Sequence, residues 1–444
     1  MSEIIINFGQ GCGKVKPMHA VNNGPAGSKV RKGNNTYEYF KEAGIPYARN
    51  HDASFHQAYG GEYTVDVHRI FTDFNADPED PASYDFEMTD MCVAETFSVG
   101  TEVFYRLGSR IEHGKKKGTF PPPDFKKWAV ICEHIIRHYN EGWANGFEYG
   151  IKYWEIWNEP DCYNADGSNP CWQGTKEQFA EFFATAVSHL KEKFPSLKIG
   201  GPAFASIRSN PEKDKFIDIV FKALNEKNAK LDFFSFHCYA KEPCDLRVVI
   251  ERAKEIINTY GHNDAELILN EWNYVRGWLA DDWTYSLRAE KGLKGASFIA
   301  GCMCVGQSSD LDMLMYYDAR PCAMNGMFDT DFLTPLKGYY PFKMFGELYR
   351  MGEAVEPQYE ETPIYCVAAK GDGKYAIMLT NFAEDDASPS QTVTLKLSGI
   401  PENAKAEIVL LDNEHDAEVV KVLEKADNIT LDIPLFSVVE IRIS

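Results

Sequence analysis

Hydrophobic positions along the first 351 residues alternate between two patterns. Short apolar runs of strand length are followed by loops, and then by longer segments with the three- and four-residue spacing of an amphipathic helix. We expect strands at Pro17–Val21, Ile45–Arg49, Thr101–Leu107, Tyr153–Trp157, Leu197–Pro202, Phe233–His237, Glu266–Asn270 and Asp312–Tyr317. We expect helices at Tyr37–Ala43, Phe86–Phe97, Asp124–Tyr139, Lys176–Lys193, Lys213–Asn225, Leu246–Tyr260, Tyr285–Val305 and Gly338–Met351. Eight strands alternating with eight helices favour an α/β fold, a parallel sheet closed into a (β/α)₈ TIM barrel.

The pattern changes after Met351. Short alternating runs separated by Gly, Asp, Asn and Pro lie at Ile364–Ala369, Lys374–Asn381, Thr392–Ser398, Ala406–Leu411, Asn428–Ile433 and Val438–Ser444. Regularly spaced short strands are typical of a β-sandwich. We therefore predict a barrel over residues 13–351 and a C-terminal β-sandwich over residues 352–444. Residues 1–12 contain a further strand, Glu3–Phe8, which we expect to pair with the sandwich.

Composition limits the binding partners and the cellular compartment that we expect for this protein. A net charge of −20 repels nucleic-acid phosphates and anionic lipids, so we expect neither nucleic acid nor a membrane as a partner. The N-terminus lacks a basic segment followed by a long apolar run, and no secretory signal is expected. Eleven scattered cysteines without paired CxxC motifs favour a reducing, cytoplasmic location.

Two glutamates follow apolar strands at places where barrel enzymes carry their active sites. The segment Trp154-Glu-Ile-Trp-Asn-Glu-Pro-Asp161 places Asn158 and Glu159 after the fourth predicted strand, and Glu271 follows the seventh. The C-terminal ends of barrel strands meet at one face, so the two carboxylates are expected to face each other. Such a pair hydrolyses glycosides when one carboxyl is held neutral as the acid and the other ionised as the nucleophile. A separation of about 5 Å between them predicts retention of the anomeric configuration.

These motifs resemble the clan A glycoside hydrolases, and within that clan family 39, which includes β-xylosidases and α-L-iduronidases. The segment Lys16–Pro25, with its Val-Asn-Asn-Gly-Pro, is similar to the family's opening motif. Ala48-Arg-Asn-His51 is similar to its strand-two motif, and Ser235-Phe-His-Cys-Tyr239 to the clan's strand-six motif. The resemblance implies a retaining exo-glycosidase, β-xylosidase-like, that acts on plant-derived oligosaccharides.

The resemblance also implies roles for individual residues. Glu159 would be the acid/base and Glu271 the nucleophile, with Asn158 holding the sugar 2-hydroxyl. Arg49 and Tyr239 would hydrogen-bond Glu271 and keep it ionised. The expected lining of the sugar subsite is completed by His19, His51, His237, Tyr317 and Trp272, with Trp157 and Trp278 as further candidates for stacking platforms.

The eighth predicted strand departs from the clan pattern. It reads Met313-Leu-Met-Tyr-Tyr-Asp-Ala-Arg320 where many clan members carry a tryptophan beneath the sugar. Tyr316 or Tyr317 is expected to replace that ring, and Asp318 or Arg320 to contact a hydroxyl or an acid group. The identity of the sugar is therefore open.

Other classes fit the sequence less well. There is no GxSxG motif of a serine hydrolase, and the first strand lacks the paired histidines of a metal-dependent barrel hydrolase. We expect no cofactor and no metal ion, an oligosaccharide or glycoside as substrate, and leave a homo-oligomer open. The alternatives that remain are an endo-acting clan A glycanase and a catalytically inactive sugar-binding barrel.

Overall fold

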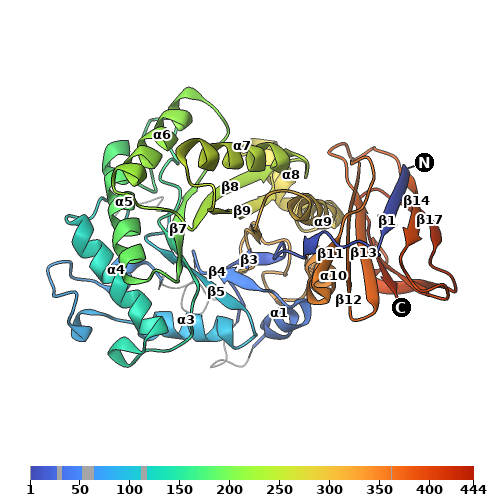
Figure 1. The fold of residues 1–444 in the computed structure, drawn as a ribbon, viewed down its shortest axis with the longest axis horizontal. Coiled ribbons are helices and arrows are strands. Elements are labelled where there is room, and N and C mark those ends of the chain that lie inside the picture. Colours follow the sequence, from blue (N-terminus) through green and yellow to red (C-terminus); the bar gives the residue numbers. More distant parts are fainter. Residues whose placement is uncertain (1, 28–32, 53–64, 112–117, 362) are drawn as a thin grey trace.

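The computed structural model describes residues 2–27, 33–52, 65–111, 118–361 and 363–444. Within these ranges eight parallel strands close into a barrel in the order β10-β3-β4-β5-β6-β7-β8-β9, which confirms the predicted fold class (Figure 1). The barrel strands are β3 (Ala20–Asn22), β4 (Tyr47–Arg49), β5 (Glu102–Leu107), β6 (Tyr153–Ile156), β7 (Lys198–Phe204), β8 (Phe233–Ala240), β9 (Glu266–Tyr274) and β10 (Met313–Tyr316). One end of the barrel interior is filled by apolar side chains of these strands, including Phe104, Phe233 and Ile268.

Helices surround the barrel, and local sequence sets their ends. The helices are α1 (Tyr37–Ala43), α2 (Val67–Ile70), α3 (Glu87–Phe97), α4 (Phe125–Asn140), α5 (Lys176–Lys193), α6 (Pro211–Glu226), α7 (Asp245–Tyr260), α8 (Ala280–Ala289), α9 (Leu293–Gln307) and α10 (Tyr339–Met351). Thr175 and Gln178 form a reciprocal capping box at the start of α5, as the sequence indicates. Gly44 ends α1 in the left-handed conformation that favours glycine.

The structure corrects the predicted elements near the C-terminal half of the barrel. The segment Tyr285–Val305, predicted as one helix, belongs to two helices, because the chain is extended at Gly292 between α8 and α9. Strand β9 also runs four residues past its predicted end at Asn270, because its pairing with β8 continues through a register shift. Glu271 therefore lies inside a strand, which fixes its backbone on both sides.

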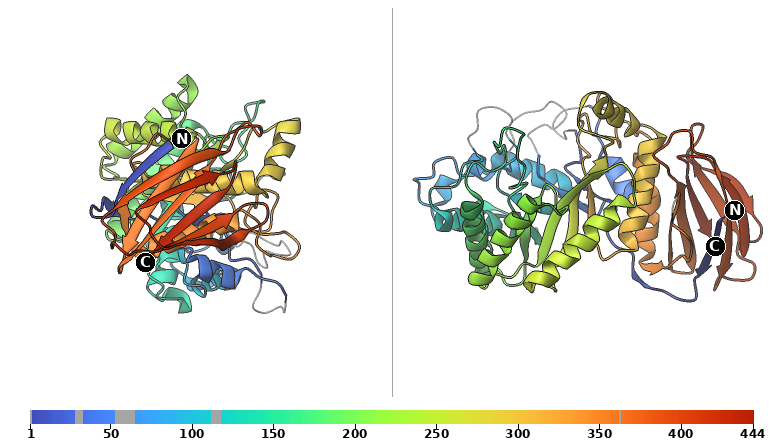
Figure 2. Two further views of the ribbon diagram at one scale, coloured as in Figure 1. Left: turned by 90° about the vertical axis from the view of Figure 1, so that its right-hand side faces the viewer. Right: turned by 90° about the horizontal axis from the view of Figure 1, so that it is seen from above.

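The C-terminal strands form two sheets packed face to face (Figure 2). One sheet has the order β1-β14-β17 and the other β16-β15-β18-β13-β12-β11-β2. Their bounds are β1 (Ser2–Asn7), β2 (Gly13–Lys14), β11 (Glu353–Val355), β12 (Ile364–Gly371), β13 (Lys374–Asn381), β14 (Gln391–Ser398), β15 (Ala406–Leu411), β16 (Asp416–Leu423), β17 (Asn428–Ile433) and β18 (Val438–Ile443). Strands β2, β11 and β16 are absent from the prediction. Two are very short, and β16 is an exposed edge strand without a buried face.

The N-terminal strand belongs to the sandwich. Strand β1 pairs in parallel with β14, with Ile4 opposite Leu395. Ile4 and Ile6 point into the sandwich core and are fully buried. The next strand, β2, also joins the sandwich through β11, although the prediction assigned residue 13 to the barrel.

We expect Ile6→Ala to destabilise the sandwich far more than Ile5→Ala. Ile6 is fully buried, whereas its neighbour Ile5 points outward and is 43% exposed. Truncating a buried isoleucine costs about 2–5 kcal/mol in the free energy of unfolding, because the lost burial leaves a cavity. Denaturant unfolding of the two variants and the unchanged protein measures this difference. Equal effects at the two positions would mean that β1 is not docked as described.

Helices α9 and α10 lie between the barrel and the sandwich (Figure 1), where both contact β12 and β13. Every residue of α9 from Lys294 to Gly306 is buried. Even so, among the described residues no helix is both long and apolar enough to cross a membrane. The apolar character of α9 thus reflects its position between the two parts of the fold.

Candidate active site

The chain leaves β6 through a strained turn that presents Asn158 and Glu159. Trp157 and Glu159 both adopt left-handed backbone angles, with φ of 76° and 47°. The backbone N–H of Trp157 donates to Leu107 O at 2.7 Å, and that of Glu159 donates to Ala203 O at 2.9 Å. Strain of this kind persists where surrounding contacts hold it, and it is concentrated at functional sites.

Glu159 and Glu271 face each other across the barrel mouth, as predicted. A carboxylate oxygen of each lies within 4.8 Å of the other and of a ring nitrogen of His237. The side chain of Glu159 is 16% exposed and that of Glu271 is 6% exposed. Both carboxylates are thus close together and largely shielded from water, while Glu159 keeps the greater access.

Arg49 organises the floor of this site. Its guanidinium donates from Nη1 to Glu271 Oε1 at 2.8 Å and from Nη2 to Asn158 Oδ1 at 2.6 Å. Tyr239 donates its hydroxyl to the other oxygen, Glu271 Oε2, at 3.0 Å. Both predicted donors to Glu271 are therefore in place, and the same arginine orients Asn158.

Beneath Arg49 lies a buried carboxylate that sequence reasoning missed. Glu155 is fully buried and accepts hydrogen bonds from Arg49 Nε at 2.7 Å, Ser235 Oγ at 2.6 Å and Asn270 Nδ2 at 2.5 Å. An acidic residue inside an apolar strand is a signal for such a network, because buried charges require partners. Glu155 fixes Arg49, and through it both Asn158 and Glu271.

His237 lies between the two glutamates. Its Nδ1 is 2.8 Å from Glu159 Oε1 and 3.5 Å from Glu271 Oε2. Burial lowers the pKa of His237, but the two carboxylates outweigh it and hold that pKa above its usual value. The imidazole is therefore a reservoir of one proton next to both glutamates.

The pKa values of the two glutamates differ from the expected order. Burial raises the pKa of Glu271, against the lowering effects of His237 and Arg49. Burial acts the same way on Glu159, but the hydrogen bond and charge of His237 bring the pKa of that carboxyl below its usual value. Without substrate, the three groups thus titrate together: His237 and Glu271 hold a proton more readily than usual, and Glu159 less readily.

His51 is held neutral beside Glu271. Arg106 donates from Nε to His51 Nδ1 at 3.1 Å, so the ring proton resides on Nε2. That Nε2 is 3.9 Å from Glu271 Oε1. Burial, together with the charges of Arg49 and Arg106, lowers the pKa of His51 well below its usual value. His51 is therefore a neutral donor aimed into the site.

A second polar group lies on the strand-eight side of the mouth. Tyr317 donates its hydroxyl to Asp52 Oδ2 at 2.8 Å, and Arg320 lies 3.0 Å from the same carboxylate. Arg320 also pairs with Asp318 at 2.8 Å. The expected contacts of Tyr317, Asp318 and Arg320 with the sugar stay a prediction, and Asp52 was not anticipated, since no motif marks it.

The structure does not bring His19 and Trp272 into this group. His19 is fully buried, with Nε2 3.1 Å from Gly44 O and its ring against Phe345 and Tyr349 of α10. Trp272 packs behind the barrel wall against Phe298 of α9. Side chains alternate along a strand, so Trp272 points outward where Glu271 points inward.

Among the predicted platforms only Trp278 is exposed. Trp157 is buried against Trp172, with its Nε1 donating to Cys171 O. Trp278 is 55% exposed, and its ring lies edge-on to that of Tyr239, 5.0 Å between centroids. Its ring also stacks on that of Trp283, 5.2 Å between centroids, so Trp278 lies beside Tyr239 as the exposed member of an aromatic pair.

Two groups of side chains could hold a metal ion within the described residues. One is Glu159, His237 and Glu271, and the other is Glu159, Cys162 and Cys171. The first is the carboxylate pair itself. The second lies on the loop that follows β6.

A closed (β/α)₈ barrel with two facing glutamates at the mouth defines the class of the paired-carboxylate glycoside hydrolases. The model of the glycosyl hydrolases family 39 matches residues 43–267, just over half of the sequence. The chain belongs to this family. The matched region includes Glu159 and ends four residues before Glu271.

Individual relatives agree with this assignment. The beta-xylosidase of Caldicellulosiruptor saccharolyticus is 25% identical over an alignment of 173 residues, which covers 37% of this chain and 32% of the relative. The chain thus matches about a third of that protein. A glucosidase from Croceicoccus marinus superimposes with a TM-score of 0.80 at 22% identity, covering 100% of this chain and 99% of that one. A monomeric beta-xylosidase from Caulobacter crescentus CB15 gives 0.72 at 15% identity, with 100% and 99% covered. At these identities the two structures show the fold alone.

Proposed function

We propose that this protein is a retaining exo-glycosidase that cleaves its substrate by double displacement, with Glu271 as nucleophile and Glu159 as acid/base. The observation that carries the proposal is the separation of the carboxylates, whose nearest oxygens lie within 4.8 Å. Retaining enzymes hold the two carboxyl groups about 5–5.5 Å apart, whereas inverting enzymes need about 6.5–9.5 Å to admit a water.

The two glutamates have different partners, and these suit different roles. Glu271 receives Arg49 on one oxygen and Tyr239 on the other, so its orientation is fixed for attack on the anomeric carbon. Within the described residues, His237 is the one ionisable nitrogen partner that lies within hydrogen-bond distance of Glu159. Of the two glutamates, Glu159 is the more exposed. It can therefore reach the leaving oxygen and later the incoming water.

His237 gives Glu159 the proton for the first step. Substrate binding removes the remaining water from Glu159, which favours the neutral carboxyl and moves the proton from Nδ1 across the 2.8 Å contact. Glu159 then protonates the leaving group while Glu271 forms the glycosyl–enzyme bond. In the second step Glu159 accepts a proton from water, which hydrolyses that bond.

We expect His237→Gln to move the alkaline limb of the kcat/KM profile to lower pH. Glutamine keeps a hydrogen-bond donor beside Glu159 but cannot carry the proton. The carboxylates hold the pKa of His237 above its usual value, so the unchanged protein should keep its active proton above pH 6.5. In the variant one of the two carboxyl groups must hold that proton without the histidine, and it loses the proton at lower pH.

His51→Gln is the matched control for this experiment. His51 is neutral over the same range because its pKa is lowered, so its replacement should change rates without moving the limb. An alkaline limb that stays in place in His237→Gln would exclude the histidine as the proton source.

The sugar is proposed from the relatives. We favour a β-xyloside, because one partial relative is a beta-xylosidase, and plant-derived oligosaccharides as its source. A panel of nitrophenyl glycosides tests this, with nitrophenyl β-xyloside expected to be hydrolysed fastest. Faster hydrolysis of another glycoside would reassign the sugar. Cleavage of internal bonds in a polymer would favour an endo-acting glycanase, and sugar binding without any turnover an inactive barrel.

We also propose a reducing, cytoplasmic compartment. Each of the eleven cysteines lies within the described residues and is a free thiol. Proteins from oxidising compartments usually carry disulfides instead.

A further inference from the structure

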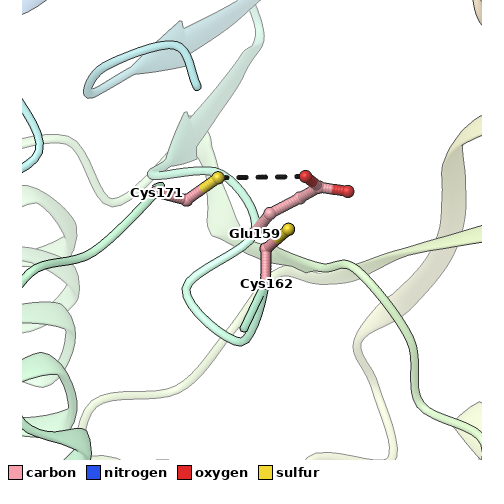
Figure 3. Close-up of side chains that lie close together, drawn as sticks. All are labelled: Glu159, Cys162 and Cys171. Carbon is pink, nitrogen blue, oxygen red and sulfur yellow. Dashed lines mark hydrogen bonds between the residues drawn. The ribbon is translucent and has the colours of Figure 1, made fainter. Parts of the chain in front are cut away.

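Two thiols lie beside the carboxylate of Glu159. The loop that follows β6 turns back on itself and presents Cys162 and Cys171 to this glutamate (Figure 3). Cys171 Sγ is 3.9 Å from Glu159 Oε2, and one ligand atom of each of the three residues lies within 4.8 Å of the others. Neither thiol has a part in the mechanism proposed above.

The loop fixes both cysteines by specific hydrogen bonds. Asn169 donates from Nδ2 to Pro160 O at 2.7 Å and accepts from the backbone N–H of Cys171 at 2.8 Å. Trp157 Nε1 donates to Cys171 O at 3.0 Å. The backbone N–H of Cys162 donates to Glu159 O at 3.1 Å. The three side chains therefore converge because the backbone around them is held, as metal sites require.

The spacing suits a tetrahedral d¹⁰ cation. With Zn–S bonds of about 2.3 Å and Zn–O bonds of about 2.0 Å, tetrahedral angles put sulfur and oxygen roughly 3.5 Å apart and two sulfurs roughly 3.8 Å apart. The observed 3.9 Å between Cys171 Sγ and Glu159 Oε2 exceeds this by a few tenths of an ångström. Small side-chain rotations close that difference, and a fourth position remains for water.

One of the two thiols borders a cavity. Cys162 is half-buried and lines a cavity of about 530 Å³ together with Tyr163, Lys176 and Phe216. Cys171, by contrast, is buried. Cys162 and the exposed part of the Glu159 side chain, 16% of it, are thus the parts of the cluster that a cation meets first.

We propose that Glu159, Cys162 and Cys171 form a binding site for Zn²⁺ or Cd²⁺, and that a bound cation inhibits the enzyme. The part on inhibition rests on the proposed role of Glu159, whereas the part on binding does not. Each thiol releases its proton to solvent as its sulfur binds the cation. A carboxylate bound to the cation can neither protonate a leaving group nor accept a proton from water.

Cadmium absorption tests the binding directly. The reduced, chelator-treated protein is titrated with Cd²⁺ while the thiolate-to-cadmium absorption in the ultraviolet is followed. We expect one site per chain with two thiolates, and a loss of affinity of more than about tenfold in Cys162→Ser and in Cys171→Ser. Changes in residues that merely support a ligand already cost about 10–100-fold in metal affinity.

Cys12→Ser is the control, because Cys12 is exposed and distant in the fold, on the sandwich side. It should leave this site unchanged. The proposal would be overturned if the unchanged protein showed no stoichiometric cadmium–thiolate absorption. It would also be overturned if Cys162→Ser and Cys162→Ala both showed the full absorption. Thermal unfolding of each variant identifies any that fail to fold, and Cys162 is the half-buried position at which substitution is easiest.

Inhibition by Zn²⁺ tests the functional part separately. We expect Zn²⁺ to lower kcat/KM most for glycosides with poor leaving groups, and a chelator to reverse this inhibition. The same inhibition of Cys162→Ser should need more than about tenfold more Zn²⁺. Equal inhibition of the unchanged and Cys162→Ser proteins would overturn it. Cadmium absorption without any glycosidase activity would leave the binding site intact and refute the proposed function instead.

Discussion

Replacing Glu271 by alanine should lower kcat by a factor on the order of 10⁵ or more, the scale found when an enzyme loses its nucleophile. Without this carboxylate no glycosyl–enzyme bond can form, so glycosides with good and with poor leaving groups should be affected alike. Arg49 and Tyr239 would keep their places but lose the group that they orient. Steady-state rates on a nitrophenyl glycoside and on an unactivated oligosaccharide measure the effect.

Glu266→Ala is the matched control on the same strand. Glu266 lies at the start of β9, at the opposite end of the barrel from the mouth, and pairs with Lys198 and with the hydroxyl of Tyr153. Its loss should leave kcat close to that of the unchanged protein. Residual activity of Glu271→Ala within about tenfold of normal would remove Glu271 from the nucleophile's role.

Replacing Glu159 by alanine should have a selective effect. General acid catalysis contributes about 10²–10⁴-fold, so substrates with poor leaving groups should lose this much in kcat/KM. Substrates whose leaving groups need no protonation should react normally in the first step and then accumulate as the glycosyl–enzyme. Azide, which needs no base to attack, should restore turnover and give a glycosyl azide of retained configuration.

The exposed Glu177 of α5 provides a control, since Glu177→Ala should leave kcat/KM unchanged for substrates with poor and with good leaving groups. Equal losses on all leaving groups in Glu159→Ala, without rescue by azide, would assign the acid/base to another residue.

Much of this fold follows from periodicity. The eight apolar runs are long enough, and the helical spacing between them regular enough, that the closed barrel is the natural arrangement. The site was predictable where a motif ties a residue to a strand end, as Asn-Glu-Pro does for Glu159. Arg49 and Tyr239 were reached through the family resemblance, and both contacts with Glu271 are present.

Other features depend on side-chain direction and loop path, which spacing does not give. His19 was placed in the site by its motif, yet its side chain points away from the barrel axis and contacts α10. Trp272 could have been excluded by strand alternation, once Glu271 was taken to face inward. Cys162 and Cys171 are nine residues apart on a loop, and only the folded turn shows that both reach Glu159.

The sequence also did not predict which of the two carboxyl groups has the raised pKa and which the lowered pKa. The expectation that Glu271 is ionised and Glu159 neutral came from their roles. The structure places His237 between them, so that the proton is shared among three groups before substrate binds. The family resemblance placed His237 in the sugar subsite, but nothing in the sequence indicated that its ring lies between the two carboxylates.

The anomeric configuration of the first-formed product tests the central claim most directly. Proton NMR during hydrolysis of a nitrophenyl glycoside records that product before it mutarotates. The nearest oxygens of the two carboxylates lie within 4.8 Å, a separation typical of retaining enzymes, so the account predicts the configuration of the substrate. Appearance of the opposite anomer first would contradict it.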